Sequence, residues 1–411
     1  MSKKQQTILE AVGRNPVHPF PARMAPDIVL DAIDGLDDSV RLLDPMMGSG
    51  TVLAIARSQG HRVIGVDSDP LAVLLARVWT TTIDAQVVHK RAAEVLKRAK
   101  VIFQTLPSGQ AYPTYADPDT RRFIRYWFDD YARRQLTALS IVINRVRDQH
   151  IRDVLWCGFS RLIITKKAGA SLAMDLSHSR PHKKFRLAPV KPFSKFMQAV
   201  RAVISNCPQR ANKGVGPLAR VTRGDARRLA IGDCSIDIVV TSPPYLNAID
   251  YLRCSKFSLI WIGYALAELR QIRGANIGAE AASAEAVGAD WVQSIITKLQ
   301  LRPQLTPCDR RLLSQYIWDM NLAISETARV LRPGAPAIYV VGDSTIRGTF
   351  IRNSRLIALL ANRHGLSLVS RRSRRLPANR RYLPPPTTTE AASALDNRMR
   401  RELVMEFRKA A

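Results

Sequence analysis

Short apolar runs alternate along the chain with longer stretches of helical periodicity. The apolar runs predict buried strands at residues 40–44, 62–67, 219–223, 237–240 and 337–342. The helical periodicity predicts helices at residues 25–33, 52–59, 256–266 and 312–330, and one or two helices within residues 121–146. Strands and helices that alternate in this way are typical of an α/β fold with a mostly parallel sheet.

A glycine-rich turn follows the first predicted strand. The run Asp44-Pro45-Met46-Met47-Gly48-Ser49-Gly50-Thr51 leads from this strand into a helix. Glycines let the backbone approach a ligand closely, and a helix N-terminus is electropositive. Asp67 ends the second strand. Its distance in sequence from Gly48 is close to the roughly 20 residues at which a carboxylate after a glycine turn binds ribose hydroxyls. The order predicts a nucleoside site, and the absence of a G-x-G-x-x-G pattern in the turn argues against a dehydrogenase.

A second polar turn, Thr241-Ser242-Pro243-Pro244-Tyr245, follows the fourth predicted strand. Two consecutive prolines fix the backbone and lack N–H groups, so a rigid edge of acceptors lies where a parallel sheet delivers its ligands. Ser242 adds a hydroxyl, Pro243 a carbonyl and Tyr245 a flat ring. This combination suits hydrogen bonding and stacking of a base that carries an exocyclic amino group.

Both turns resemble motifs of the S-adenosylmethionine-dependent amino-group DNA methyltransferases, the cytosine-N4 and adenine-N6 type. Residues 241–245 are similar to the S/D/N-P-P-Y/F catalytic motif, and residues 44–51 to the D/N-P-x-x-G-S-G-T donor loop. The resemblance implies a class I methyltransferase fold, a Rossmann-like sheet flanked by helices. It also implies S-adenosylmethionine as cofactor and a catalytic set of Ser242, Pro243, Pro244 and Tyr245.

The resemblance extends to two further donor-binding segments. In this family a His-Pro-x-Pro segment, here within residues 15–24, closes over the methionine half of the donor, and a Gly-Asp pair, here Gly224-Asp225, contacts its adenine. A Pro-rich entry loop and an ordinary turn are the alternatives for these segments. The implied donor site consists of Asp44, Pro45, Gly48, Ser49, Gly50, Thr51, Asp67, Asp225, Phe20 and Arg23.

The net charge points to a polyanionic partner. The 411 residues carry a formal charge of +28, with a pI near 10.6, which favours nucleic acid because clustered cations release counterions from phosphates. Residues 91–220 hold 25 Lys and Arg against 8 Asp and Glu, with aromatics interleaved. This predicts a large basic, mainly helical insertion that recognises DNA, and a solvated helical cap is the alternative.

Two basic stretches supply the candidate DNA contacts. Residues 171–184 combine hydroxyls, imidazoles and cations, and residues 371–384 combine arginines with a tyrosine. Phosphate binding is the functional interpretation and a solvated face the alternative. The candidates are Ser177, His178, Arg180, Lys183, Lys184, Arg374, Arg375, Arg380 and Arg381.

Composition disfavours several classes of protein. The five cysteines are scattered and form no C-x-x-C pair, so neither disulfides nor a thiolate zinc site is expected, and no metal is predicted. No run of about 18 apolar residues predicts a membrane span. The polar N-terminal residues lack a signal-peptide pattern, and we expect a cytoplasmic, nucleoid-associated prokaryotic protein.

The predicted organisation has four segments. Residues 1–90 form the donor-binding part, 91–218 the basic insertion, 219–386 the catalytic part and 387–411 a C-terminal helix. A capping box at Thr387 to Glu390 supports that helix. Residues 271–284 are predicted to be a loop near the substrate.

The resemblance implies site-specific methylation of double-stranded DNA at the amino group of a flipped base. Ser242 at the first motif position favours cytosine N4, with adenine N6 as the alternative. Methylation of RNA or of a protein glutamine, and a catalytically degenerate DNA-binding protein, are further alternatives. A cognate restriction endonuclease is a candidate partner.

Overall fold

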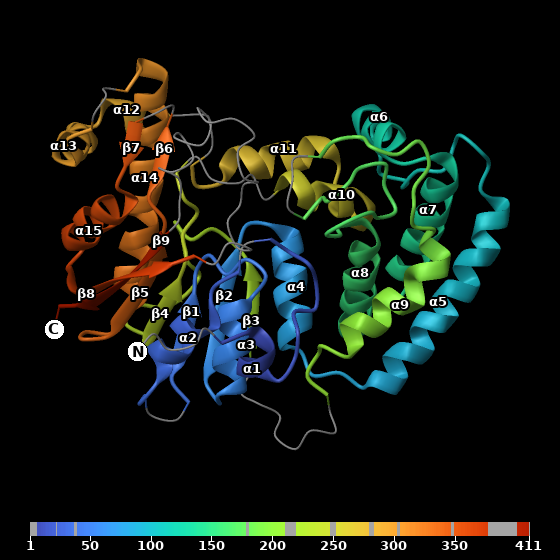
Figure 1. Ribbon diagram of the computed structural model, residues 1–411, viewed down its shortest axis with the longest axis horizontal. Coiled ribbons are helices and arrows are strands. Elements are labelled where there is room, and N and C mark those ends of the chain that lie inside the picture. The colour runs from blue at the N-terminus through green and yellow to red at the C-terminus, as the bar shows by residue number, and fades with distance from the viewer. Residues whose placement is uncertain are drawn as a thin grey trace.

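The computed structural model describes residues 6–21, 23–36, 39–177, 181–209, 219–246, 252–278, 283–301, 305–346, 349–376 and 401–410 (Figure 1). The sheet in this part of the chain has the order β3-β2-β1-β4-β5-β9-β8. Its strands are β1 (Arg41–Asp44), β2 (Arg62–Asp67), β3 (Ala219–Arg223), β4 (Ile238–Thr241), β5 (Pro336–Val341), β8 (Leu366–Arg375) and β9 (Arg401–Lys409).

Strands β1 to β5 are parallel, and β9 is antiparallel to both β5 and β8. The short strands β6 (Ser344–Ile346) and β7 (Thr349–Ile351) form a separate antiparallel pair. A mostly parallel sheet with flanking helices confirms the predicted α/β class, and its strand order is that of the class I methyltransferase fold. The carboxyl ends of β1 to β4 point toward the top of Figure 1.

Helices connect and surround these strands. They are α1 (Ile8–Val12), α2 (Pro26–Ile33), α3 (Thr51–Ser58), α4 (Pro70–Thr80), α5 (Ala85–Thr105), α6 (Pro118–Trp127), α7 (Asp130–Asn144), α8 (Gln149–Ile163), α9 (Pro192–Ile204), α10 (Leu252–Ile262), α11 (Leu266–Ala275), α12 (Ala284–Gly288), α13 (Asp290–Leu299), α14 (Pro307–Val330) and α15 (Asn353–Arg363).

Apolar side chains seal both faces of the sheet. Helices α2 and α3 cover one face through a core that includes Leu42, Leu53 and Val63. Helices α14 and α15 cover the other face through a core that includes Ile317 and Phe407. Burying apolar surface on both faces explains why consecutive residues are apolar in β4, as are Leu42 and Leu43 in β1, instead of alternating with polar ones.

A helical body lies beyond α4, on the right of Figure 1. Helices α5, α7, α8 and α9 pack together and meet α4 and α10 around Leu136, Phe159 and Trp261. The body occupies the predicted insertion, although its first helix begins at Ala85, before the expected boundary at residue 91. The predicted helical stretch 121–146 is two helices, α6 and α7.

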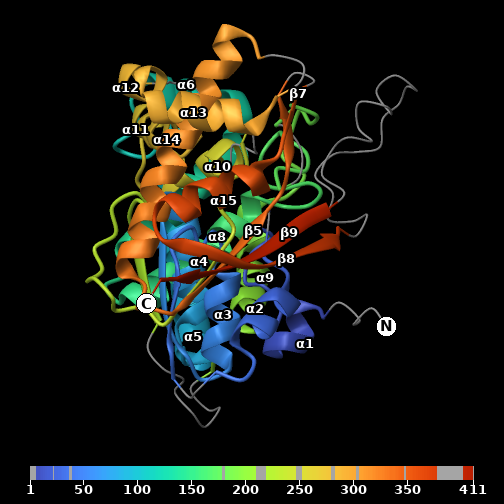
Figure 2. The ribbon, with the colours of Figure 1, turned by 90° about the vertical axis from the view of Figure 1, so that its left-hand side faces the viewer.

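The predicted C-terminal helix is wrong for residues 401–409, which form β9. Val404, Met405 and Phe407 are buried there between β5 and β8, and Figure 2 shows the three strands side by side. The capping box that suggested a helix lies outside the described residues. The predicted loop at 271–284 is also partly wrong, because α11 continues to Ala275.

In the described part of the chain, every helix is too short or too polar to cross a bilayer. The same residues contain no cluster of three or more His, Cys, Asp or Glu side chains arranged to hold a metal ion.

Candidate active site

The site is built at the carboxyl ends of β1, β2 and β4. Asp44 ends β1, Asp67 ends β2, and Thr241 ends β4 immediately before the Pro-Pro turn. These strands are neighbours in the sheet. The parallel register therefore brings the glycine turn, the second-strand acid and the Pro-Pro turn to one edge, as the sequence predicted.

The glycine turn is fastened to β2. The N–H of Gly48 donates to Asp67 Oδ2 at 2.8 Å, and the N–H of Met47 donates to the Val66 carbonyl at 3.1 Å. Gly50 begins α3 with φ near 81° and no side-chain cap. A Cβ at this position would lie 2.7 Å from the Cβ of Ala76 on α4. Only glycine therefore allows the turn to pass so close to α4.

Asp44 is a buried acceptor. Its Oδ1 accepts a hydrogen bond from Thr241 Oγ1 at 2.7 Å and another from the Met46 N–H at 3.1 Å. Burial raises the pKa of the Asp44 carboxyl to about 7. Asp44 thus links the start of the glycine turn to the last residue before the Pro-Pro turn.

Asp67 and Asp69 form the second-strand side of the site. Burial raises the pKa of Asp67, while hydrogen bonds from the N–H groups of Asp69 and Gly48 oppose this shift. Asp69 caps α4 by accepting from the Leu71 N–H at 2.8 Å, and its Oδ2 accepts from Ser255 Oγ at 2.7 Å. Burial raises the pKa of Asp69 to about 7. The link between Asp69 and α10 joins residues far apart in the sequence and was not predicted.

The N-terminal segment packs against the glycine turn. Pro16, Val17, His18 and Arg23 line a narrow hollow, too small for a water molecule, together with Ser49 from the turn and with Leu75 and Trp79 from α4. His18 Nε2 lies 3.0 Å from Ser160 Oγ, and a guanidinium N–H of Arg23 donates to the His18 carbonyl. Burial, followed by the charges of Arg161 and Arg23, holds the pKa of His18 well below its usual range.

This hollow has unused hydrogen-bonding capacity. Among the described residues, Ser49 Oγ, His18 Nδ1 and Trp79 Nε1 are buried without a hydrogen-bond partner, as is Thr51 Oγ1 in the first turn of α3. Buried polar groups normally have partners. A small polar ligand beside the glycine turn would supply them. Phe20, also predicted at the donor, is part of the apolar core around α4.

The Pro-Pro turn is held by groups outside it. Ser242 Oγ donates to the Val340 carbonyl of β5 at 3.1 Å and lies 3.4 Å from the Tyr245 hydroxyl. The Pro244 carbonyl accepts from the Tyr316 hydroxyl of α14 at 2.9 Å. Because a hydroxyl has a single proton, donation to Val340 leaves the Ser242 oxygen as an acceptor for a further group.

Asp225 has a partner that the sequence did not reveal. Its two carboxylate oxygens accept hydrogen bonds at 2.7 to 3.1 Å from the guanidinium of Arg227, and Oδ1 also accepts from the Arg227 N–H at 2.9 Å. Arg227 in turn reaches Asp319 on α14 at 2.7 Å. These contacts hold the pKa of Asp225 below its usual range against the opposing effect of burial.

The candidate DNA contacts divide into exposed and structural residues. Lys183 and Lys184 are exposed, and the Lys183 ammonium lies 5.0 Å from the ring centre of Tyr126. Ser177 is 2% exposed, so its side chain is not open to a duplex. His178, Arg180, Arg380 and Arg381 lie outside the described residues.

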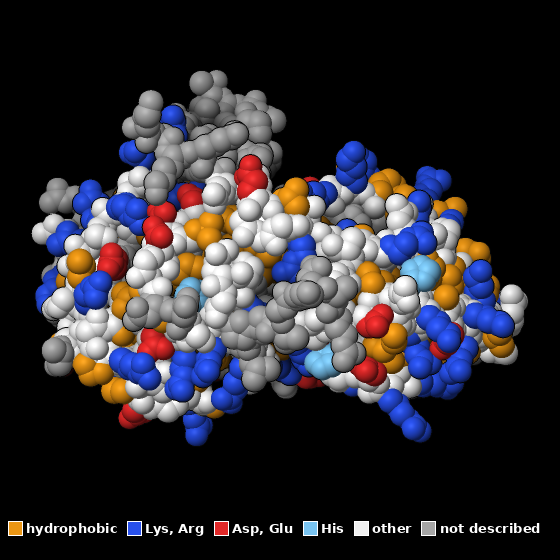
Figure 3. Space-filling model, turned by 90° about the horizontal axis from the view of Figure 1, so that it is seen from below, with side chains coloured by type: hydrophobic (Ala, Val, Ile, Leu, Met, Phe, Trp, Pro, Cys, Tyr) orange, Lys and Arg blue, Asp and Glu red, His pale blue; other side chains and the backbone are white. Residues whose placement is uncertain are grey.

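Arg374 is also a structural residue. Its guanidinium pairs with Asp27 of α2 at 3.5 Å and with Glu402 of β9 at 3.3 Å, and its side chain is 14% exposed. These two ion pairs compete with the predicted phosphate contact of Arg374, whereas its neighbour Arg375 is exposed. Cations also cover the face opposite the carboxyl ends of the strands, including the α5 end of the molecule (Figure 3).

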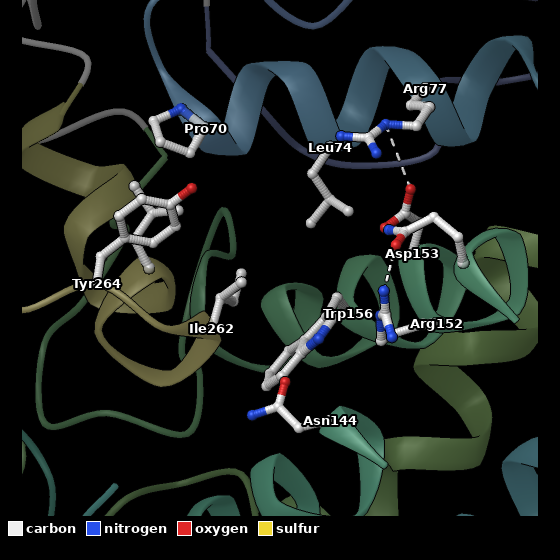
Figure 4. Close-up of a pocket in the computed structure, with 11 residues that line it drawn as sticks. Pro70, Leu74, Arg77, Asn144, Arg152, Asp153, Trp156, Ile262 and Tyr264 are labelled. Atoms are coloured by element: carbon white, nitrogen blue, oxygen red, sulfur yellow. Dashed lines mark hydrogen bonds and ion pairs between the residues drawn. The ribbon is translucent and has the colours of Figure 1, made fainter. Parts of the chain in front are cut away.

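A separate pocket of about 310 Å³ lies between α4, α8 and the turn after α10 (Figure 4). Trp156 and Tyr264 line it, and Asp153 pairs there with Arg77 at 3.3 Å. Burial raises the pKa of Asp153, and the charge of Arg77 opposes the shift. The Pro-Pro turn contributes nothing to this pocket.

Two known type II methyltransferases are similar in sequence to this chain. No family model matches the chain. The chain is similar to the type II methyltransferase M.MvaI of Kocuria varians, with 24% identity over 394 residues that cover 88% of this chain and 84% of the relative. It is also similar to the type II methyltransferase M.BsoBI of Geobacillus stearothermophilus, with 22% identity over 279 residues that cover 59% of this chain and 51% of the relative.

Solved structures resemble this chain only weakly, with TM-scores below 0.5. A SAM-dependent methyltransferase of Methanosarcina mazei overlaps 95% of this chain and 99% of its own, with 11% identity and a TM-score of 0.33. A putative DNA modification methylase of Thermus thermophilus overlaps 46% of this chain and 51% of its own, with 15% identity and a TM-score of 0.24. The curated relatives of the chain are type II methyltransferases.

Proposed function

We propose that this chain, a relative of the type II methyltransferases, is a site-specific DNA methyltransferase that acts on the N4 amino group of cytosine. The observation that carries the proposal is the Ser242 hydroxyl, whose proton is donated to Val340 and whose oxygen is left as a neutral acceptor beside Tyr245. Serine at this motif position often accompanies cytosine in the methyltransferases that the turn resembles.

The methyl donor is S-adenosylmethionine, which supplies a methyl group on a sulfonium. Its amino-acid end would lie beside the glycine turn, where Ser49 Oγ and His18 Nδ1 are buried without partners among the described residues. Asp67, at the end of β2, would take the ribose.

The chain's own residues would prepare the target nitrogen. The lone pair of an exocyclic amine is delocalised into the ring, so an acceptor that draws an N–H toward itself makes the nitrogen more nucleophilic. Ser242 Oγ and the Pro243 carbonyl are such acceptors. Tyr245, which is half-buried, would stack on the flipped base.

Double-stranded DNA is the proposed substrate, since the net charge of +28 favours phosphate binding. The type II name of both relatives supports a cognate endonuclease as partner.

The test is methylation of DNA amplified in vitro, which offers every sequence without prior methylation. The protein is incubated with labelled donor and this DNA, with RNA, or with protein, and nucleosides are identified by mass spectrometry. We expect N4-methylcytosine in DNA. N6-methyladenine as the product would replace the cytosine assignment, and no label in any substrate would refute the enzyme.

Ser242→Ala should abolish methyl transfer. The affinity for the donor, measured by calorimetry, should change less than about threefold, since the substitution removes only one uncharged hydrogen bond. Ser235→Ala is the control, because the Ser235 hydroxyl also donates to a carbonyl, that of Gly232, but precedes β4 instead of following it. Normal activity of Ser242→Ala would contradict its role.

A further inference from the structure

The Pro-Pro turn cannot hold itself in place by main-chain donors. Pro243 and Pro244 have no N–H, so the turn depends on groups from neighbouring elements. One such group is the hydroxyl of Tyr316, which donates to the Pro244 carbonyl at 2.9 Å. Tyr316 is 0% exposed on α14, and a Cβ on Gly278 would lie 3.3 Å from its ring.

The same face of α14 also reaches the donor side of the site. Asp319 follows Tyr316 by three residues, a spacing that places both side chains on one side of a helix. Asp319 pairs with Arg227 at 2.7 Å, and Arg227 grips Asp225 beyond the end of β3. Asp319 also accepts from the Gln315 amide at 3.0 Å. One rigid helix thus contacts the catalytic turn and the strand end beside Asp67.

We propose that Tyr316 is a positioning residue for methyl transfer, which fixes the Pro244 carbonyl and through it the directions of Ser242 and Tyr245. The inference rests on the proposed methyltransferase function. The ion pair between Asp319 and Arg227 fixes the position of α14, so that the Tyr316 hydroxyl reaches the Pro244 carbonyl. Because a displacement of about 1 Å costs up to 100-fold in rate, loss of this single hydrogen bond acts mainly on the chemical step.

Tyr316→Phe removes the hydroxyl and keeps the ring. We expect the single-turnover rate at saturating donor and DNA to fall about tenfold or more, with the donor Kd changed less than about twofold. The matched control is Tyr339→Phe on β5. Tyr339 is equally buried, and its hydroxyl donates to Thr327 Oγ1 of α14 at 3.0 Å instead of to the turn. Both variants lose one buried hydrogen bond, so their melting temperatures should fall alike, but only Tyr316→Phe should lose rate.

The outcomes separate this inference from the proposed function. A wild-type protein that methylates no DNA refutes the function itself. An active wild type with a Tyr316→Phe rate equal to that of Tyr339→Phe refutes the positioning role. A loss in Tyr316→Phe that appears only as weaker donor binding, with a normal rate at saturation, also refutes it. Asp319→Asn should produce a smaller rate loss, because it weakens the hold on Arg227 and leaves the Tyr316 hydroxyl in place.

Discussion

Three carboxylates at the donor edge are held by different groups. Asp44 accepts from Thr241, Asp67 from the glycine turn, and Asp69 from Ser255. Asp44 and Asp69 have pKa values raised to about 7 by burial. The site therefore contains carboxyl groups whose charge changes near neutral pH.

Asp44→Asn should stabilise the fold more as the pH rises. The pKa of Asp44 is about 7 in the folded chain and 3.8 in the unfolded chain, so between these values the folded chain binds more protons. Stability from this carboxyl is complete below the lower value and is lost as the pH rises toward 7. Asparagine retains an oxygen for Thr241 and Met46 but does not ionise.

Thermal unfolding at pH 5 and pH 8 checks this prediction. The advantage of Asp44→Asn should be larger at pH 8, with an upper bound of about 4 kcal/mol for a shift of roughly three pKa units. Asp84→Asn is the control, since Asp84 is exposed and also accepts from two backbone N–H groups. An equal advantage at both pH values would contradict the argument.

The residues that the sequence predicted at this edge are those encoded locally. Asp44 and Asp67 end strands, and Gly50 and Ser242 lie in the turns that follow strands, so a strand pattern and a turn suffice to bring them together. Tyr316 was missed because a buried tyrosine on an amphipathic helix has the same pattern as any core aromatic. Its contact with Pro244 joins residues far apart in the sequence.

At the scale of elements, the glycine turn depends on the close approach of α3 and α4. Gly50→Ala would place its Cβ 2.7 Å from the Cβ of Ala76 and 2.9 Å from its Cα, in addition to the strain of a φ near 81°. Since the Ala76 Cα belongs to the backbone, α4 itself would have to move. We expect a loss of about 3 kcal/mol or more in unfolding free energy, together with weaker donor binding.

Gly60→Ala separates strain from collision. Gly60 follows the other end of α3, with φ near 93° and nothing within 4 Å of an added Cβ. Its substitution should cost only about 1 to 2 kcal/mol and leave donor binding unchanged. Equal losses in both variants, measured by denaturant unfolding, would show that α4 does not restrict the turn.

Strand β8 offers a second matched pair. Arg374→Ala should lower the free energy of unfolding by about 1 to 3 kcal/mol, because it leaves Asp27 and Glu402 without this partner. Arg375→Ala, at the adjacent exposed position, should change stability by less than about 0.5 kcal/mol. DNA affinity that falls for Arg374→Ala at unchanged stability would restore its predicted role as a phosphate contact.

At the scale of the whole molecule, Lys and Arg side chains lie on the face shown in Figure 3, and Lys183 and Lys184 are exposed as well, so charge alone does not locate the duplex. Lys183 and Lys184 pair through their backbone with residues 172–173, and the Lys183 ammonium lies over the ring of Tyr126 in α6. In Figure 1, α6 lies at the top of the helical body, at the level of α11 and above the carboxyl ends of the strands. We expect these lysines to contact phosphates.

Replacing both Lys183 and Lys184 by alanine should make the log–log salt dependence of DNA affinity less steep by roughly 2. The control replaces Lys90 and Lys97, two exposed lysines of α5. Binding titrations at several salt concentrations measure both slopes. A larger change in the control would assign the duplex to the α5 surface.

The parallel part of the sheet was predictable and the antiparallel part was not. Strands β1, β2, β4 and β5 contain short apolar runs next to turn signals, whereas β9 carries five charged residues, Arg401, Glu402, Glu406, Arg408 and Lys409. Its strand conformation comes from pairing with β5 and β8 on both sides, a long-range effect that local patterns do not encode. The ion pairs of Arg374 were hidden for the same reason.

The position of β9 has a consequence for biosynthesis. β5 leaves the ribosome before β8 and well before β9, the strand that pairs with the outer edge of β5. Until residues 401–409 emerge, the nascent chain presents an apolar strand with unpaired N–H and C=O groups, a template for pairing with other chains. Translation speed over the last segment, or a chaperone that shields this edge, would therefore govern the yield of native protein.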